Sequence, residues 1–180
     1  MHVAAKAEVR RQLRGLRRER VAARDRAADA EAIAVAALAA VDRAGVRAGE
    51  WVAAYESMPT EPPTEALLGA MSARGIRVMV PVTRPDWDLD WREAGTQEQL
   101  GREAIAQARV VFVPAHGIDP AGTRMGQGKG CYDRALPRTS GRRVAVVHPW
   151  EVLDEPLPHD QHDQPVDDVL AAGLGLRQLH

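Results

Sequence analysis

The sequence predicts an α/β protein in which helices cover a mostly parallel sheet. Short apolar runs typical of buried strands alternate with longer amphipathic or Ala-rich segments typical of helices. The chain has 180 residues, of which 45% are hydrophobic, and this is enough to bury a core in one domain spanning residues 1–180. Only 4% of the residues are aromatic, so Ala, Val, Leu and Ile must build that core. This pattern does not give the order of the strands.

Two helices are expected first. Residues 4–24 are predicted to form an amphipathic helix, because Val9, Leu13 and Leu16 recur at helical spacing. Its basic residues share another face, and such a face is usually solvated; these residues are Lys6, Arg10, Arg14 and Arg17. Residues 28–44 are predicted to form a second, Ala-rich helix that ends at Gly45.

Apolar runs predict buried strands at residues 51–55, 76–80, 110–113 and 143–147. A proline-rich loop follows the first run, and Thr64 is expected to cap the helix after it. Pro81 is expected to stop the second run. Residues 86–91 alternate polar and apolar side chains, as an edge strand does. Trp87 and Trp91 could line a ligand pocket, but we expect them to pack against the sheet.

Composition and charge exclude several classes of protein. No apolar run is long enough to span a membrane, and the Arg-rich N-terminus lacks the hydrophobic region of a signal peptide. The single Cys131 excludes an internal disulfide and fits a reducing compartment, so we expect a cytoplasmic protein without a membrane partner. Residues 1–26 hold nine Lys or Arg against three Asp or Glu, but the remainder holds 15 against 22. We therefore expect no nucleic-acid partner, and we expect a monomer.

A glycine-rich loop between residues 113 and 134 is the strongest functional feature. It combines alternating glycines with charged residues, namely Gly126, Gly128, Gly130, Arg124, Lys129 and Asp133. Alternating glycines allow positive φ and bring several backbone N–H groups to one anion, and the two basic side chains add positive charge. The pattern is neither the Walker loop nor GxGxxG. It favours a polyphosphate site over an ordinary surface turn, and residues 131–136 are expected to start a helix.

A segment rich in His and Asp lies near the C-terminus and contains His159, Asp160, His162, Asp163 and Asp167. Its composition suits a transition metal, but the spacing lacks a helical HxxxH pair or a Cys partner. Mg²⁺ is preferred, because it takes oxygen ligands and often needs only one or two carboxylates plus phosphate oxygens. His148, at the end of the last apolar run, is expected to be a structural histidine.

These motifs resemble those of a known family. Residues 124–134, RMGQGKGCYDR, are similar to the RxGxGxGxYDR signature of 5-formyltetrahydrofolate cyclo-ligases, also called methenyltetrahydrofolate synthetases. KAEVR at residues 6–10 resembles the KxxxR opening of the family, and residues 158–170 resemble its late HDxxVDxV element. The resemblance covers nearly the whole chain and weakens between residues 95 and 109, where family members usually have a longer connection.

The resemblance implies a three-layer α/β/α fold and the ATP- and Mg²⁺-dependent cyclisation of 5-formyltetrahydrofolate to 5,10-methenyltetrahydrofolate. In this reaction the formyl oxygen attacks the γ-phosphate, N10 attacks the resulting iminium phosphate, and ADP and phosphate are released. Two partners are thus expected, ATP and 5-formyltetrahydrofolate.

The resemblance also assigns site residues. Met58, Glu61 and Tyr132 are expected to bind the folate, and a carboxylate such as that of Glu61 can accept two N–H bonds from the pterin edge. Asp133 and Asp163 are expected to hold Mg²⁺. The residues expected to bind ATP are Lys6, Arg10, Arg124, Gly126, Gly128, Lys129, Gly130 and Tyr132. The expected catalytic residues are Lys6, Arg124, Lys129 and Asp133.

Two other classes of function stay open. One is an ATP-binding relative without folate chemistry. The other is a nucleic-acid binder that uses the basic N-terminal helix, and its affinity would fall steeply with salt.

Overall fold

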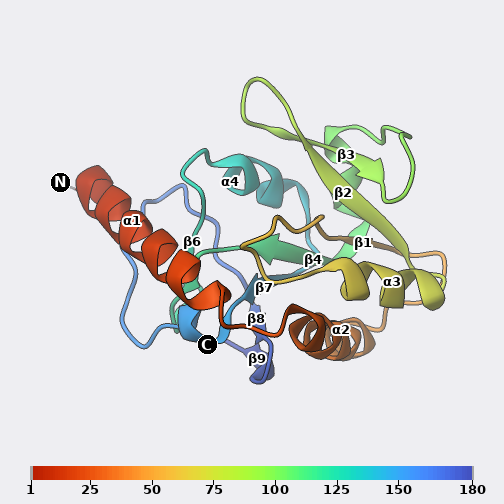
Figure 1. Ribbon diagram of the computed structural model, residues 1–180. Coiled ribbons are helices and arrows are strands. Elements are labelled where there is room, and N and C mark those ends of the chain that lie inside the picture. The colour runs from red at the N-terminus through yellow and green to blue at the C-terminus, as the bar shows by residue number, and fades with distance from the viewer. Residues whose placement is uncertain (1, 180) are drawn as a thin grey trace.

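The computed structural model describes residues 2–179, which form a seven-stranded sheet flanked by helices (Figure 1). The strand order is β3-β2-β1-β4-β7-β8-β9. The five central strands are parallel, and the edge strands β3 and β9 are antiparallel to their neighbours, which confirms the predicted mostly parallel sheet. The strands are β1 (Trp51–Ala53), β2 (Arg77–Thr83), β3 (Leu89–Glu93), β4 (Ala108–Pro114), β7 (Arg142–Val147), β8 (Asp168–Ala171) and β9 (Gly175–Gln178).

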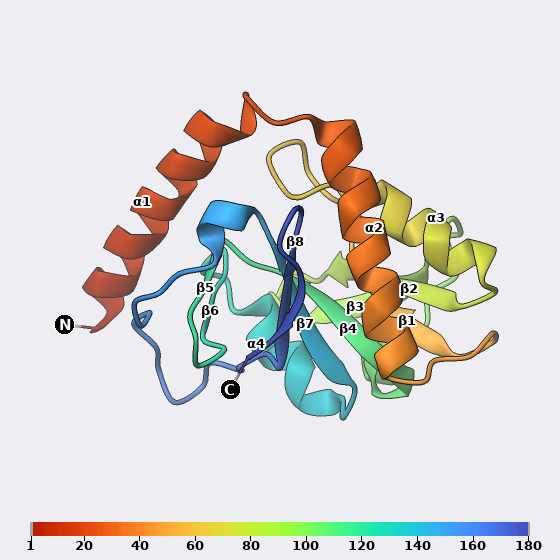
Figure 2. The same ribbon diagram turned by 90° about the horizontal axis from the view of Figure 1, so that it is seen from below.

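Helices cover both faces of the sheet, which confirms the three-layer arrangement (Figure 2). One face carries α2 (Arg26–Arg43) and α3 (Glu65–Ala73). The other carries the short α4 (Cys131–Ala135) and two 3₁₀ helices, η1 (Arg102–Gln107) and η2 (Leu136–Arg138). Among residues 2–179, no helix combines the length and the hydrophobicity needed to cross a membrane.

The first helix, α1 (His2–Val21), stands apart from both layers (Figure 2). It packs through Leu13 against Met125 of a two-stranded ribbon, formed by β5 (Gly117–Ile118) and β6 (Arg124–Met125). A third 3₁₀ helix, η3 (Pro149–Glu151), follows β7. The helix that carries the predicted basic face is therefore tied to the glycine-rich loop by its apolar seam.

The alternation of side chains along the strands divides the core into two clusters. In β1, Val52 belongs to the cluster under α2 and α3, whereas Trp51 and Ala53 belong to the cluster under α4 and η1. Strands buried on both faces read as continuous apolar runs. This explains why the sequence revealed β1, β2, β4 and β7. It missed β8, which is also buried but begins with Asp168 and has only four residues, and it missed the short strands β5, β6 and β9.

The boundary between the first two helices lies earlier in the chain than predicted. α1 ends at Val21, and α2 begins at Arg26 because the Asp25 side chain caps it by accepting from the Ala28 N–H at 3.1 Å.

The predicted cap at Thr64 is wrong. Thr64 precedes α3, but its side chain makes no capping bond. Its hydroxyl instead donates to Tyr55 O at 2.6 Å and accepts from the Ser57 N–H at 3.1 Å. Thr64 therefore closes the loop in front of α3, the loop that carries Glu61.

Pro81 does not stop its strand, contrary to prediction, because β2 continues to Thr83. In β2, Met79 O accepts from Ala54 N on the β1 side, whereas Val78 O accepts from Ala94 N on the β3 side. By alternation Pro81 also faces the β1 side, and β1 has already ended at Ala53. No ladder bond is lost there, so proline is tolerated.

The predicted packing of the two tryptophans holds for only one of them. Trp91 is fully buried in the core, but Trp87 is 44% exposed, since β3 begins only at Leu89 and Trp87 lies in the turn before it.

His148 is buried, with Nε2 3.0 Å from Thr60 O, and burial lowers its pKa to about 4. A neutral, packed imidazole agrees with the predicted structural role.

Candidate functional site

A cavity of about 580 Å³ opens at the carboxyl ends of the parallel strands. Tyr55 and Glu56 line it after β1, and Ala115 and His116 line it after β4. From β1 the chain first moves to β2 on one side and later to β4 on the other, so the cavity lies where the strand order reverses. Ligands in open α/β sheets usually bind at this position.

The glycine loop joins β6 to α4 and forms one wall of the cavity. A Cβ at Gly126 would lie 2.5 Å from Arg124 Nη1. Gly128 has a φ of +98°, and a Cβ there would lie 3.0 Å from the Arg10 guanidinium. Gly130 precedes α4 in the left-handed conformation. The alternating glycines thus let two arginines approach the loop backbone.

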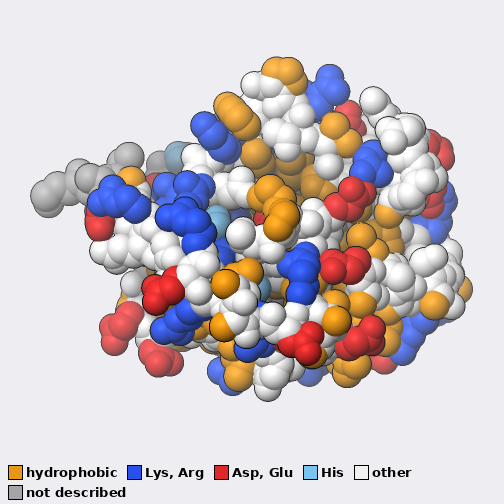
Figure 3. Space-filling view, in the orientation of Figure 1, with side chains coloured by type: hydrophobic (Ala, Val, Ile, Leu, Met, Phe, Trp, Pro, Cys, Tyr) orange, Lys and Arg blue, Asp and Glu red, His pale blue; other side chains and the backbone are white. Residues whose placement is uncertain are grey.

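Helix α1 lies against this loop. Arg10 Nε donates to Gly126 O at 2.9 Å, and Arg14 Nη2 donates to Gln127 O at 2.8 Å. Figure 3 shows Lys and Arg side chains gathered over α1 and the surface beside it. Burial and the nearby charge of Arg14 lower the pKa of Arg10, so a bound anion would relieve charge repulsion here.

The carboxylates of this region are paired with its cations. Lys6 Nζ lies 2.8 Å from Asp160 Oδ2 and also forms an ion pair with Asp163. Burial opposes the charge of Lys6, but the two carboxylates together outweigh burial and raise its pKa. Across the loop, Arg124 Nη2 lies 3.2 Å from Asp133 Oδ1. The side chains predicted for the phosphates and for the metal therefore pair with one another.

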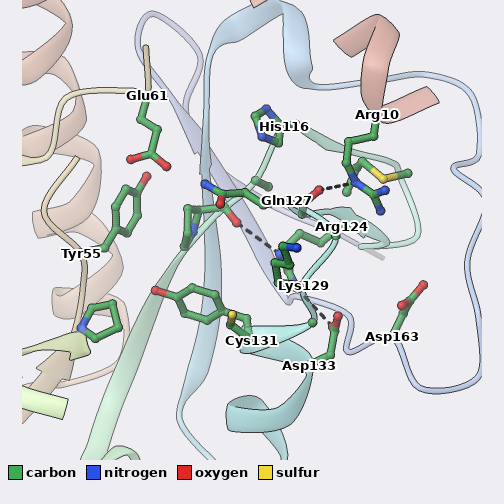
Figure 4. Close-up of a pocket in the computed structure, with 18 of the residues that line it drawn as sticks. Arg10, Tyr55, Glu61, His116, Arg124, Gln127, Lys129, Cys131, Asp133 and Asp163 are labelled. Carbon is green, nitrogen blue, oxygen red and sulfur yellow. Dashed lines mark hydrogen bonds and ion pairs between the residues drawn. The ribbon is translucent and has the colours of Figure 1, made fainter. Parts of the chain in front are cut away.

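The opposite side of the cavity is more buried, and Figure 4 shows Tyr55 and Glu61 there, away from Lys129 and Asp163. The Glu61 carboxylate accepts from the Met58 N–H at 2.8 Å, and burial raises its pKa. The hydroxyls of Tyr55 and Tyr132 are buried without a hydrogen-bond partner among the described residues. Buried polar groups without partners are rare in native structures and suit a ligand with a polar edge.

The sequence of nearly the whole chain matches one protein family. Residues 2–172 match the family described as the 5-formyltetrahydrofolate cyclo-ligase family. The chain belongs to this family. A 5-formyltetrahydrofolate cyclo-ligase from Mycolicibacterium smegmatis is 35% identical over 152 residues, which cover 73% of this chain and 78% of the relative. Another from Mus musculus is 37% identical over 67 residues, which cover 34% of this chain and 32% of the relative.

Two solved structures share the fold. A 5,10-methenyltetrahydrofolate synthetase from Mycoplasma pneumoniae matches with a TM-score of 0.73 over 93% of this chain and 97% of that one, at 19% identity. The Aquifex aeolicus 5,10-methenyltetrahydrofolate synthetase matches with a TM-score of 0.71 over 98% and 93%, also at 19% identity. Membership of the cyclo-ligase family identifies the chain as an enzyme of this type in folate one-carbon metabolism.

Every residue that the cyclo-ligase resemblance assigns to ATP, folate or Mg²⁺ lines this one cavity. They are Lys6, Arg10, Met58, Glu61, Arg124, Gly126, Gly128, Lys129, Gly130, Tyr132, Asp133 and Asp163. They come from α1, the loop before α3, β6, the glycine loop, α4 and the loop after η3. The convergence is a structural finding, and the role of each residue stays a prediction.

The sequence did not single out Arg17, which lines the cavity and is buried. Its Nε donates to Glu151 Oε1 at 2.6 Å, and its Nη2 donates to Glu151 Oε2 at 2.8 Å and to Ala115 O at 2.5 Å. Helical periodicity gave Arg17 the same face as Arg14 and could not show that one turn of α1 reaches a buried carboxylate.

His116 was also missed, although it lies between a predicted strand and the glycine loop. Its Nδ1 is buried without a partner among the described residues. Burial and the nearby arginines, Arg17 foremost, lower its pKa to about 3. The imidazole is therefore neutral at physiological pH and keeps one donor and one acceptor.

The transition-metal interpretation of the late His and Asp segment is not supported. Within the described part of the chain, no three His, Cys, Asp or Glu side chains are grouped to hold a metal ion. Asp160 and Asp163 pair with Lys6, and Asp167 accepts from the Arg143 N–H at 2.8 Å.

Proposed function

We propose that this enzyme converts 5-formyltetrahydrofolate to 5,10-methenyltetrahydrofolate, using ATP and Mg²⁺. The formyl oxygen attacks the γ-phosphorus and displaces ADP. N10 then attacks the activated formyl carbon and loses its proton to solvent, and the C–O bond breaks, so that phosphate leaves with the former formyl oxygen. The substrate supplies its own nucleophiles, and the protein positions them and neutralises charge.

The observation that carries the proposal is that a single cavity has two chemically different ends. One end holds cations and the glycine loop, and the other holds a buried carboxylate and two tyrosines. Such a cavity is suited to holding a polyphosphate and a polar heterocycle against each other, and the reaction needs this contact between the γ-phosphate and the formyl group.

At the cationic end, Lys6, Arg10, Arg124 and Lys129 would neutralise the triphosphate, together with backbone N–H groups of the glycine loop. Four residues share the basic face of α1. Three of them line this cavity, namely Lys6, Arg10 and Arg17, and the fourth, Arg14, binds the glycine loop that forms one wall of it. This orientation favours a small anionic ligand over a nucleic acid, which would need those side chains on an open surface.

The residues present also fit Mg²⁺. Asp133 and Asp163 reach the cavity from different segments, and each is only partly exposed and balanced by a cation, Arg124 or Lys6. Two carboxylates plus phosphate oxygens are a common donor set for this ion. When bound, Mg²⁺ neutralises charge on the phosphates, and Asp133 and Asp163 would hold it there.

At the buried end, Glu61 would accept hydrogen bonds from the pterin edge, and Tyr132 and Met58 would contact the ring system. The fixed loop geometry supports this assignment, because the Met58 N–H already orients the carboxylate.

The test is turnover of ATP by the purified protein with and without 5-formyltetrahydrofolate, followed together with formation of the methenyl product. We expect ADP release only when the folate is present, in equal amount to the methenyl product. ATP turnover that ignores the folate would indicate an ATP-binding relative. Absence of turnover together with salt-sensitive binding to nucleic acid would indicate a nucleic-acid binder that uses the basic helix α1.

A further inference from the structure

Trp87 has an unusual position for a large apolar residue. It lies at the turn between β2 and β3 with 44% of its surface exposed. Its φ is +63°, and it is the one residue other than glycine with positive φ in the described part of the chain. A bulky side chain in the left-handed region is a genuine outlier, and such strain persists where the surroundings over-determine it.

The turn that presents Trp87 is firmly anchored. The Arg84 N–H donates to Asp88 O, and the Trp87 N–H donates to Arg84 O, each at 2.9 Å. Asp88 is buried and accepts from Arg138 at 2.6 Å and 2.8 Å, which lowers the pKa of its carboxyl to about 2. Figure 1 shows the β2–β3 hairpin reaching beyond the sheet beside α4. The backbone of Trp87 is therefore held next to the element that follows the glycine loop.

The indole of Trp87 meets a cation of the proposed phosphate site. Lys129 Nζ lies 4.6 Å from the ring centroid, within cation–π distance. No carboxylate among the described residues forms an ion pair with Lys129, in contrast to Lys6 and Arg124. The same lysine lines the cavity. A flexible four-carbon side chain is thus held in place by an aromatic face instead of a counter-ion.

We propose that Trp87 is a positioning residue for Lys129, holding its ammonium over the mouth of the phosphate end before a triphosphate binds and while it is bound. This inference rests on the proposed function, because it assumes that Lys129 meets the ATP phosphates. A carboxylate partner would compete strongly with phosphate, whereas an indole orders the lysine and leaves its N–H donors free for phosphate oxygens. Ordering the side chain in advance lowers the entropy lost on binding.

The experiment is a double-mutant cycle read by Mg·ATP binding without folate. Trp87→Asn is chosen because Asn tolerates the left-handed conformation, so the backbone strain falls while the indole is lost. We expect Trp87→Asn to weaken Mg·ATP binding by about two- to tenfold, which is the cost of ordering one long side chain on binding, and Trp87→Phe to retain most of the affinity. In a Lys129→Gln background the same change should have no effect.

Two further measurements distinguish a positioning role of Trp87 from a structural role. The melting temperature of Trp87→Asn should hold or rise, whereas loss of a structural tryptophan would lower it. The indole emission, isolated by subtracting the Trp87→Phe spectrum, should change when Mg·ATP is added. Leu174→Asn is the matched control, since Leu174 is 43% exposed in the turn between β8 and β9, and it should leave Mg·ATP affinity unchanged.

The inference is overturned if Trp87→Asn leaves Mg·ATP affinity unaltered, if its effect persists in the Lys129→Gln background, or if the emission responds to the folate alone. If the wild-type protein does not bind Mg·ATP, the proposed function and this inference both fail. If it binds Mg·ATP but the cycle shows no coupling, only the inference fails.

Discussion

Replacing Glu61 by Gln is the sharpest test of the folate end of the site. The change keeps the shape of the side chain, and the amide oxygen can still accept from the Met58 N–H that now bonds the carboxylate at 2.8 Å. The amide N–H₂ would then face the N–H groups of the pterin. Glu61 is only 5% exposed, so the mismatched donors would find little water.

The size of the effect follows from that burial. A buried donor left without its partner costs about 1–3 kcal/mol. We therefore expect the affinity for 5-formyltetrahydrofolate to fall by about 5- to 150-fold, measured by titration calorimetry. Glu65→Gln is the control, because Glu65 is an exposed residue at the start of α3 and should leave folate affinity unchanged.

The same Glu61→Gln change should leave the thermal stability of the protein equal or higher, although it lowers folate affinity. Burial raises the pKa of Glu61 in the folded state, although the bond from Met58 partly offsets this. A raised carboxyl pKa stabilises the fold below the unfolded pKa, and this contribution is lost as pH rises through the folded pKa. Glu61→Gln should therefore match the wild-type melting temperature near about pH 4 and equal or exceed it near about pH 7. Folate affinity within twofold of wild type, in a variant that melts normally, would refute the pterin contact.

Three further predictions address the rest of the site. Lys6→Met should weaken ATP binding by about 10- to 150-fold, the value of a charge-assisted hydrogen bond, and leave folate affinity unchanged in calorimetry; equal ATP affinity would remove α1 from the site. Asp133→Asn keeps an acceptor for the Gln164 N–H, 3.1 Å away, so it should fold normally, lose most turnover and need more Mg²⁺. An unchanged Mg²⁺ midpoint with a lowered melting temperature would contradict the metal assignment. Arg17→Met leaves the buried Glu151 carboxylate without a cation and should cost about 3–5 kcal/mol in thermal or urea denaturation, and a loss below about 1 kcal/mol would contradict the buried pair.

The sequence determined much of this protein by itself. The apolar runs marked the central strands β1, β2, β4 and β7 because these strands are largely buried on both faces and need no alternation. The glycine loop was visible because close approach and positive φ both demand glycine, and Gly126 and Gly128 meet these two demands. The charged residues of the loop, Arg124, Lys129 and Asp133, could be named because chemistry is carried by residue type and local spacing.

Only the tertiary structure decided what these elements face. Helical periodicity gave Arg10 and Arg17 one face of α1, but Arg10 binds a loop carbonyl and Arg17 forms a buried pair with Glu151, 134 residues away in sequence. The same holds for Trp87, since alternation predicted a strand where the chain turns, and its partner Lys129 comes from another segment. Period and composition are local properties, whereas the partner of a side chain depends on how distant segments pack, and for that reason the sequence identified the charged groups but not their pairs.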